Sequence, residues 1–280
     1  MKLNQQQLDA FDRDGFLIFP DMLAREEVTL LKDELSRVGD IQDERVLRER
    51  DGGARIIYGM HEEDGPTASR AYNALARSPR ILQPIQDILG EDAYIFHTKC
   101  NTKEALTGAI YEWHQDYANW KAMDGVPSPQ IITAMIMLDK STELGGCLYF
   151  IPGSHSLGIV QPDVADGEQE AAIQRVVDHG EPMSVPKDKM TEIVGRFGEP
   201  VAVTGQPGTV AFFHGNLVHG SGHNMSIDSR WILYIVYGAA SNRPQAVRKP
   251  RPEFKAARIA GPAQILPAAT LFDALALTSK

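Results

Sequence analysis

A histidine and an aspartate, His114 and Asp116, lie one residue apart in the aromatic stretch IYEWHQDYANW. Residues two apart on a strand point to the same face, so this spacing predicts an imidazole and a carboxylate aimed at one point. A further histidine, His219, follows in NLVHGSGHNMSIDSR. Two histidines and one carboxylate on one side of a metal are the ligands of non-haem Fe(II) oxygenases. The pattern predicts a metal site, and its alternative is an ordinary strand with a polar face.

Other sequence motifs for chemistry are incomplete. The segment HEEDG lacks the second histidine of the H-E-x-x-H zinc-protease motif, and GSGHNM lacks the third glycine of a dinucleotide-binding loop. The sequence contains no P-loop and no G-x-S-x-G elbow. These absences leave the possible metal ligands as the strongest signal.

Composition and charge limit the partners of the chain. It has 280 residues and a net charge of -9, and its basic residues cluster only in the segment RKPRPEFKAAR, which we expect to be a solvated face. This balance argues against nucleic acid, whose phosphates require clustered Lys and Arg. No apolar run approaches the roughly 20 residues that span a bilayer. Two cysteines, Cys100 and Cys147, and no secretory segment predict a cytoplasmic location.

The pattern of the chain changes near residue 92. Before it, NQQQLDAFDRDG, REEVTLLKDELSRVGD and ASRAYNALARSPRILQPIQDILG are predicted helices, with a strand in FLIFPDML and with Gly15, Pro79 and Pro84 as punctuation. After it come short strand candidates separated by turn residues, which predict a sandwich or barrel. They are AYIFHTKCN, AIYEWHQD, IITAMIMLD, CLYFIPGSH, PVAVTGQPGTVAFFH and RWILYIVYGAA.

We therefore expect one domain over residues 1–280. It comprises a mainly helical wrap (1–92), a β core (93–245) and a C-terminal tail (246–280). A polar stretch near 161–199 is long for a connection within a compact domain, and is either a lid over a site or a tolerated surface excursion. The oligomeric state, monomer or homodimer, stays open.

Further motifs follow in the chain, so that the series is His114-Gln115-Asp116, Pro152-Gly153-Ser154-His155, His219-Gly220-Ser221, Asn224, Ser226 and Arg230. Their order and spacing resemble the phytanoyl-CoA dioxygenase (PhyH) family of Fe(II)/2-oxoglutarate-dependent oxygenases. The likeness is nearest to the ectoine hydroxylase branch, and it includes DGFLIF, RIIYGMH, YIFHTKCN and GGCLYFIPGSH. It implies a mainly β protein with a double-stranded β-helix (jelly-roll, cupin-like) core and flanking helices.

The resemblance also selects among the histidines. His214 and His223 flank His219, but only His219 has the family's spacing to Arg230, so we prefer it as the third ligand. His155, at the end of its Pro-Gly-Ser-His turn, is expected to be structural.

The resemblance implies a hydroxylase whose cofactors are Fe(II), 2-oxoglutarate as co-substrate, and O2. His114, Asp116 and His219 would bind the metal, and the guanidinium of Arg230 would bind the far carboxylate of 2-oxoglutarate. A carboxylate at Asp116 favours hydroxylation over halogenation, while desaturation and ring chemistry remain open. The other expected cofactor contacts are Ser221, Asn101 and Lys99, and Lys99 is shared with the substrate.

The substrate is predicted to be a small polar metabolite, an amino acid or an amino-acid-like zwitterion. Trp120 and Tyr117 could form an aromatic wall that holds a cation by its ring face, and His97 with Lys99 could meet a carboxylate. Both aromatic residues could instead be core. The sequence departs from the ectoine branch at Gln115, at 117–119 and at 97–101, so ectoine itself is in doubt.

Three other functions stay open from the sequence. The first is an oxygenase that tailors a hydrophobic natural product, such as a terpenoid or polyketide. The second is a non-enzymatic metal-binding barrel, and the third a zinc hydrolase on the same barrel. A coenzyme A thioester is a weaker candidate substrate, since the chain shows no basic cluster for its phosphates.

Overall fold

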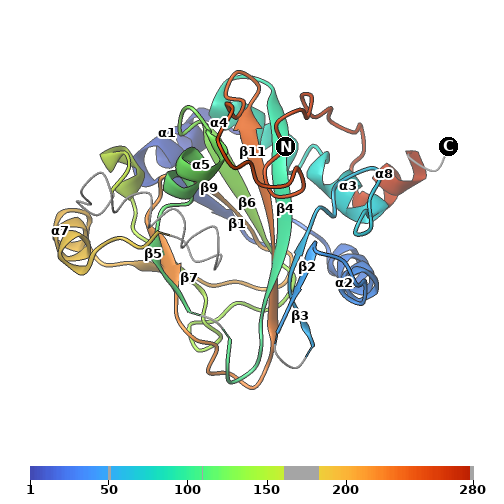
Figure 1. The fold of residues 1–280 in the computed structure, drawn as a ribbon, viewed down its shortest axis with the longest axis horizontal. Helices are drawn as coiled ribbons and strands as arrows, with labels where there is room; N and C mark the ends of the chain where they lie inside the picture. Colours follow the sequence, from blue (N-terminus) through green and yellow to red (C-terminus); the bar gives the residue numbers. More distant parts are fainter. Residues whose placement is uncertain (50–51, 109, 161–182, 278–280) are drawn as a thin grey trace.

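The computed structural model describes residues 1–49, 52–108, 110–160 and 183–277. Within these ranges the largest element is a seven-stranded antiparallel sheet in the order β1-β9-β6-β11-β4-β3-β2 (Figure 1). The two longest strands, β4 and β11, pair from Lys103 opposite Arg230 to Ala93 opposite Ala239. The strands of this sheet are β1 (Phe16–Phe19), β2 (Val46–Arg48), β3 (Ala54–Tyr58), β4 (Ala93–Lys103), β6 (Ile131–Met137), β9 (Val210–His214) and β11 (Arg230–Ala239).

A four-stranded antiparallel sheet faces the large one, in the order β5-β10-β7-β8. Its strands are β5 (Tyr111–His114), β7 (Leu148–Phe150), β8 (Val201–Val203) and β10 (His219–Ser221). Buried apolar side chains from both sheets form one cluster between them, including Met135, Leu148, Phe150, Val203 and Phe213. Two antiparallel sheets packed face to face agree with the jelly roll that the sequence predicts.

Helices cover the other face of the large sheet, where α2, α3 and α8 lie side by side (Figure 1). In α2, the apolar residues Val28, Leu31, Leu35 and Val38 recur at helical spacing, and all four are buried. Helix α1 ends at Gly15, whose φ of 82° is left-handed, so the predicted stop is confirmed. The helices on this side and at the end of the sheet are α1 (Gln5–Asp14), α2 (Arg25–Gly39), α3 (Arg70–Ala76), α4 (Leu82–Leu89) and α8 (Leu271–Leu277).

Residues 1–92 contribute more strand than predicted. The strand in FLIFPDML is confirmed as β1, but β2 and β3 were not predicted, and they extend the large sheet at its other edge. Pro79 separates α3 from α4 as expected. The prediction that Pro84 interrupts a helix is wrong, because Pro84 lies in the first turn of α4, where a missing N–H costs nothing.

The polar stretch near 161–199 is described only from residue 183. Its described part contains α7 (Lys187–Phe197), and residues 161–182, where the lid was predicted, lie outside the described residues. The basic segment RKPRPEFKAAR is a solvated face only in part: Arg248 and Lys249 are exposed, but Phe254 and Ala256 are buried and Arg251 pairs with a buried carboxylate. No helix of the described chain combines the length and apolar character that crossing a membrane requires.

Candidate active site

The three predicted metal ligands come from two strands and one helix. His114 is the last residue of β5, and His219, the first residue of β10, is its direct partner in the small sheet. Asp116 is the first residue of α5 (Asp116–Asp124). The prediction that His114 and Asp116 share one strand is therefore wrong. The chain turns from strand to helix at Gln115, the extended N-cap of α5, and this turn brings the carboxylate back toward the imidazole.

The ligand atoms of the three residues converge. Nε2 of His114 lies 3.7 Å from Oδ1 of Asp116, and Nε2 of His219 lies 3.8 Å from Oδ2 of Asp116. One ligand atom from each residue falls within 4.8 Å of the others, and no other group of three His, Cys, Asp or Glu meets this test in the described residues. The arrangement is a two-histidine, one-carboxylate site of the size that one metal ion needs.

The backbone fixes the tautomer of both histidines. Nδ1–H of His114 donates to the carbonyl oxygen of Glu112 at 2.6 Å, and Nδ1–H of His219 donates to that of Leu217 at 2.9 Å. Such bonds orient the rings of metal-binding histidines and leave the Nε2 lone pairs toward the metal.

Burial and neighbouring charges set the ionisation that a metal requires. Burial, and then the neighbouring His114, lower the pKa of His219 to about 4, so this imidazole is neutral at pH 7. Burial alone would raise the pKa of Asp116, but His114, His219 and Lys99 hold it below its usual range. The site thus presents a neutral His219 imidazole and the Asp116 carboxylate, the forms in which these residues bind a metal.

The competing histidines have other roles. Nδ1 of His214 accepts the backbone N–H of Asn216 at 3.0 Å, and Nδ1–H of His223 donates to the carbonyl of Gly108 at 2.8 Å. His155 lies beside Gly15 and His214, as expected of a structural residue. Of His214, His219 and His223, the three candidates for the third ligand, the fold brings His219 to His114 and Asp116.

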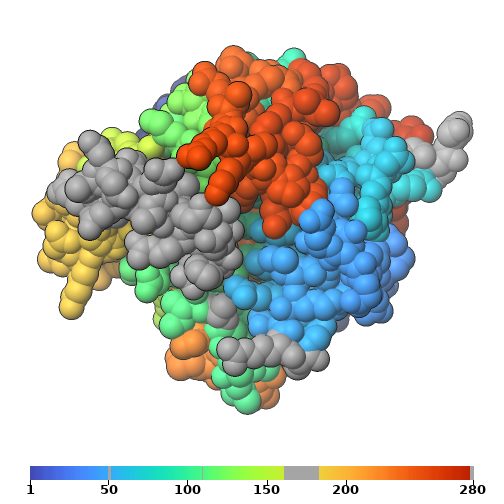
Figure 2. Space-filling model, viewed as in Figure 1, coloured from blue at the N-terminus to red at the C-terminus, as the bar shows by residue number. Residues whose placement is uncertain are grey.

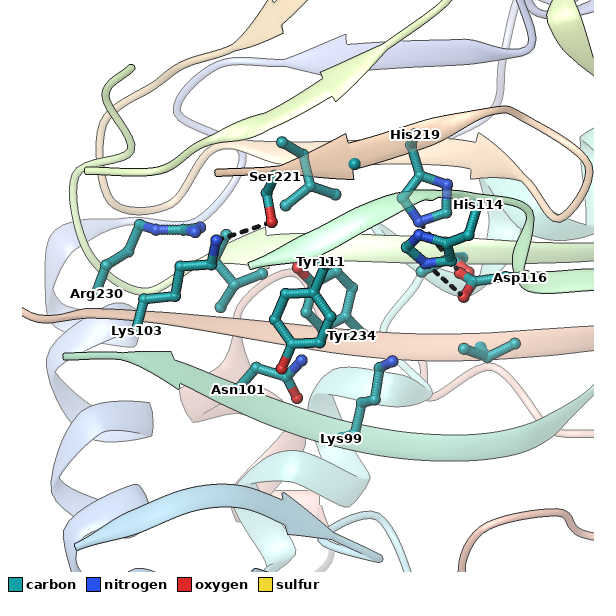
Figure 3. Close-up of a pocket in the computed structure, with 15 residues that line it drawn as sticks. Lys99, Asn101, Lys103, Tyr111, His114, Asp116, His219, Ser221, Arg230 and Tyr234 are labelled. Carbon is teal, nitrogen blue, oxygen red and sulfur yellow. Dashed lines mark hydrogen bonds and ion pairs between the residues drawn. The ribbon is translucent and has the colours of Figure 1, made fainter. Parts of the chain in front are cut away.

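The three ligands form one end of a cavity between the sheets (Figure 3), with about 580 Å³ of empty space including its mouth. At the other end lie Arg230, Lys103 and Ser221, and Tyr111 and Tyr234 lie between the two ends. The cavity therefore presents metal ligands and fixed cations to the same molecule.

Arg230, the first residue of β11, is held by backbone carbonyls. Its Nε donates to Gly145 at 3.2 Å and its Nη2 to Gly146 at 2.6 Å. Its Nη1 is buried and has no hydrogen-bond partner among the described residues. This unused face of a buried guanidinium fits a carboxylate, which accepts two parallel hydrogen bonds from it.

Lys103 is a second buried cation at this end, and sequence reasoning missed it. Its ammonium donates to Oγ of Ser221 at 2.8 Å and to the carbonyl of Gly222. Burial and the charge of Arg230 lower the pKa of Lys103 to about 7. The sequence did contain a signal for Lys103, because this residue continues the alternation of His97, Lys99 and Asn101 along one face of β4.

Several polar atoms of the cavity wall have no partner. They are Oδ1 of Asn101, the hydroxyl of Tyr111 and Oγ1 of Thr133, and all are buried in the described part of the chain. Unpaired buried polar groups are costly, so a cluster of them around one cavity indicates a polar ligand. Tyr111 and Thr133 were also missed from the sequence, since single hydroxyl groups on strands carry no motif.

The predicted cofactor residues all line the cavity. Asn101, Ser221 and Arg230 lie toward the cationic end or the middle, and Lys99 extends from β4 toward Asp116 (Figure 3). Nζ of Lys99 lies 5.3 Å from the ring centroid of Tyr234. Lys99 is thus placed between the metal ligands and the wall, where either cofactor or substrate could meet it.

The predicted substrate residues lie outside the cavity lining. The Tyr117 hydroxyl donates to the carbonyl of Pro127 at 3.0 Å, and its ring packs in an apolar cluster with Trp120 and Phe96. The ring of His97 packs against Trp120, with centroids 5.9 Å apart. Tyr117 occupies the core position that the sequence left open as its alternative.

Comparison with known proteins agrees with this geometry. Residues 11–232 match the family model described as Phytanoyl-CoA dioxygenase (PhyH). The chain is 32% identical over 267 residues to the L-proline trans-4-hydroxylase of Streptomyces griseoviridis, covering 94% of this chain and 97% of that protein. It is 30% identical over 267 residues to the ectoine dioxygenase of Nocardia farcinica, covering 92% and 86% of the two chains.

Solved structures of similar fold agree with the family match. EctD from S. alaskensis, crystallised with 2-oxoglutarate and 5-hydroxyectoine, has a TM-score of 0.79 and 28% identity, covering 96% of this chain and 89% of EctD. EctD with bound Fe has a TM-score of 0.78. This likeness confirms the predicted fold, a β core with flanking helices.

Proposed function

The chain belongs to the phytanoyl-CoA dioxygenase family, and we propose that its substrate is an amino acid or an amino-acid-like zwitterion, hydroxylated at an unactivated C–H bond. The chain is a 2-oxoglutarate-dependent dioxygenase that uses Fe(II). The observation that carries the proposal is a cavity with three convergent metal ligands at one end and an unpaired guanidinium nitrogen at the other.

In this proposal His114, Asp116 and His219 hold the iron. Their ligand atoms are two Nε2 lone pairs and one carboxylate, and both Nδ1–H groups are occupied by backbone carbonyls. These residues occupy one side of a metal and leave the other side for 2-oxoglutarate, dioxygen and the nearby substrate. The carboxylate of Asp116 would occupy a ligand position that a halide would otherwise need, so oxygen rather than halide transfer is favoured.

Arg230 is proposed to bind the far carboxylate of 2-oxoglutarate through Nη1. Lys103 adds a second positive charge, and its bond to Ser221 places that hydroxyl at the same end of the cavity. Asn101 and Tyr111 contribute buried polar atoms along the wall between the two ends. Together they orient the co-substrate so that its keto acid faces the metal ligands.

The chemistry that iron supplies is the activation of dioxygen, in which 2-oxoglutarate becomes succinate and carbon dioxide and the second oxygen atom enters a C–H bond of the substrate. The protein contributes position: the cavity lies between two sheets, so the reacting groups meet away from bulk water.

Two observations favour a small charged substrate over a hydrophobic one. Relatives over nearly the whole chain are named for L-proline and ectoine. Lys99 lies beside the metal ligands, and Oγ1 of Thr133 in the cavity wall is buried and has no partner among the described residues. A hydrophobic natural product would leave these polar groups unpaired, at a cost of about 1–3 kcal/mol each.

The test is substrate-dependent release of succinate. Purified protein with Fe(II), 2-oxoglutarate and ascorbate is offered the proteinogenic L-amino acids, ectoine, acyl thioesters and terpenoids, with His219→Ala as the inactive control. We expect succinate and hydroxylated product in equal amounts with at least one zwitterion. Coupled turnover with a neutral hydrophobic compound, and with no zwitterion, would contradict the proposed substrate class.

The cytoplasmic location stays a prediction. Both cysteines are free and buried.

A further inference from the structure

A glutamine, Gln115, lies between two of the metal ligands, and its side chain is buried. It is 1% exposed. Its Nε2 donates to the carbonyl oxygens of Gly158 at 2.8 Å and Asn216 at 2.7 Å, and its Oε1 accepts the N–H of Val160 at 2.7 Å. Both donor hydrogens and the carbonyl of the amide are therefore used. A buried amide with these bonds fixes the segments that it joins, because breaking one bond would leave polar groups unpaired in the interior.

The first of these segments leads to the third metal ligand. Asn216 lies in the connection between β9 and β10, three positions before His219. The same connection holds the residue after Asp116, since the N–H of Tyr117 donates to the carbonyl oxygen of Gly215 at 2.8 Å. The residues on both sides of Asp116 are thus bonded to this connection. The two bonds set the distance between the turn that carries Asp116 and the strand that begins with His219.

Asp116 depends on these bonds more than the two histidines do. His114 and His219 are direct partners in the small sheet, which fixes their separation. Asp116 lies outside the sheet, at the start of α5, and follows Gln115 in extended conformation (φ -120°, ψ 124°). Its carboxylate oxygens lie 3.7 Å from Nε2 of His114 and 3.8 Å from Nε2 of His219, and this placement follows from how the turn at Gln115 is held.

The second segment, residues 158–160, directly precedes residues 161–182, and the chain that follows them is held by α5. Asn119, one helical turn after Gln115, accepts the N–H of Met183 with Oδ1 at 2.9 Å and donates from Nδ2 to the carbonyl oxygen of Gln115 at 3.1 Å. Beyond Met183 the chain leads into α7, the gold surface at the left edge of Figure 2. The turn between the metal ligands and the helix that follows it therefore contact the chain on both sides of residues 161–182.

We propose that Gln115 is a positioning residue for the iron: its amide holds the Asp116 carboxylate in place opposite His219 and couples the metal ligands to the chain at Val160. This inference rests on the proposed function, because it takes His114, Asp116 and His219 as the iron ligands. Coupling is reciprocal, so a bound metal must strengthen the bonds of Gln115 by as much as those bonds strengthen metal binding.

The simpler explanation is that Gln115 only stabilises the fold, as any buried amide can. Asn242 offers a matched comparison, because it is 3% exposed and its amide is bonded in the same pattern. Its Nδ2 donates to the carbonyl oxygens of Ser128 at 2.8 Å and Gln130 at 3.1 Å, and its Oδ1 accepts the N–H of Ser128 at 2.9 Å. Asn242 is not among the described residues that line the cavity. A role in the fold alone predicts the same behaviour for both amides, whereas a positioning role predicts an effect of Gln115 on the metal.

The first measurement is the affinity for Fe(II), by calorimetry without dioxygen at a temperature where every variant is folded. Gln115→Met and Asn242→Leu each replace the amide by an apolar side chain of similar size, and both should lower the melting temperature of the metal-free protein. Only Gln115→Met should raise Kd for Fe(II), by about tenfold to hundredfold, which is the usual effect of removing a group that orients metal ligands. A Kd equal to that of the wild type, or an equal rise in Asn242→Leu, would overturn the positioning role.

The second measurement needs no variant, so it tests the inference even where Gln115→Met fails to fold. Hydrogen exchange of single amides is followed by mass spectrometry in the wild type, with and without Fe(II) in the absence of dioxygen. Binding should slow exchange of the Val160 N–H, which Gln115 holds, more than exchange of the Ser128 N–H, which Asn242 holds. Equal slowing of both amides would mean that the metal acts on the fold as a whole, and the inference would be wrong.

The ligand variants separate this inference from the proposed function. If Asp116→Ala and His219→Ala lose Fe(II) binding while Gln115→Met keeps the wild-type Kd, the metal ligands stand and only the role of Gln115 fails. If both ligand variants bind Fe(II) as the wild type does, the metal site of the proposed function fails, and this inference fails with it.

Discussion

His114 and His219 are direct partners across β5 and β10, with ring centroids 4.2 Å apart. Each donates its Nδ1–H to the carbonyl of the residue two positions earlier, Glu112 and Leu217. Two adjacent strands thus hold each imidazole in a fixed orientation before any metal binds. The small sheet preorganises the site. Loss of one ligand side chain should therefore affect metal binding rather than folding.

Replacing a metal ligand should therefore remove function and leave the fold. We expect His114→Ala, Asp116→Ala and His219→Ala each to abolish succinate release and the rise in melting temperature on adding Fe(II) without dioxygen. Far-UV circular dichroism should stay as in the wild type. His223→Ala is the matched control and should keep both properties; a loss in that variant with an active His219→Ala would move the third ligand to His223.

Arg230→Ala should raise KM for 2-oxoglutarate about tenfold to hundredfold, because charge-assisted hydrogen bonds contribute about 1.5–3 kcal/mol. Arg230→Lys should restore it only in part, since an ammonium cannot match both carboxylate oxygens. The measurement is the 2-oxoglutarate dependence of succinate release at saturating substrate. An unchanged KM in Arg230→Ala would remove this residue from the co-substrate site.

Lys103 should make co-substrate binding depend on pH. Burial and Arg230 lower the pKa of Lys103 to about 7, and a bound dicarboxylate favours the ammonium form. Above pH 7 the free protein must therefore take up a proton on binding, so KM for 2-oxoglutarate should rise by up to about tenfold per pH unit. Lys103→Arg, which stays charged, should flatten the profile between pH 6.5 and 8.5. A wild-type KM that is flat over the same range would contradict this assignment.

Glu27 is a buried charge outside the site whose replacement should destabilise the fold. It is 1% exposed and accepts hydrogen bonds from Arg80 and from the N–H groups of Ala24 and Leu271. Glu27→Gln should lower the free energy of unfolding by about 3–5 kcal/mol at pH 7, because it leaves Arg80 without its carboxylate. Exposed Glu26→Gln, on the same helix, is the control and should change it by less than about 0.5 kcal/mol.

The carboxyl group of Glu27 should also make the free energy of unfolding fall at acid pH. Burial alone would raise the pKa of Glu27, but Arg80 and the two backbone N–H groups hold it below the ordinary 4.5. The unfolded chain thus protonates first, and the stabilisation is full above about pH 4.5 and is lost as the pH falls below it. Denaturant unfolding between pH 3 and 7 should show a smaller acid-dependent loss in Glu27→Gln than in the wild type.

The sequence predicted most strands of the core and the residues of the metal site, because these depend on local patterns, but it missed β2, β3 and β10. Alternation along β4 placed Lys99 and Asn101 on one face, and the fold adds Lys103 to that face. The helical position of Asp116 was not predictable from spacing, since H-x-D fits both a strand and a strand-to-helix turn. Arg251 was assigned to solvent because its partner, Asp124, lies far away in the sequence and is buried only by tertiary packing.

The large sheet joins parts of the chain that are synthesised far apart. β1 pairs with β9, Phe16 opposite Phe213, and the bond from Leu271 to Glu27 spans 244 positions. During translation β1 therefore stays unpaired until most of the chain, including β9, has been synthesised. Loop closure over such distances slows folding and leaves strand edges exposed in the meantime. Production of this protein should accordingly benefit from low temperature and chaperones, and its refolding from denaturant should be slow compared with helical proteins of equal length.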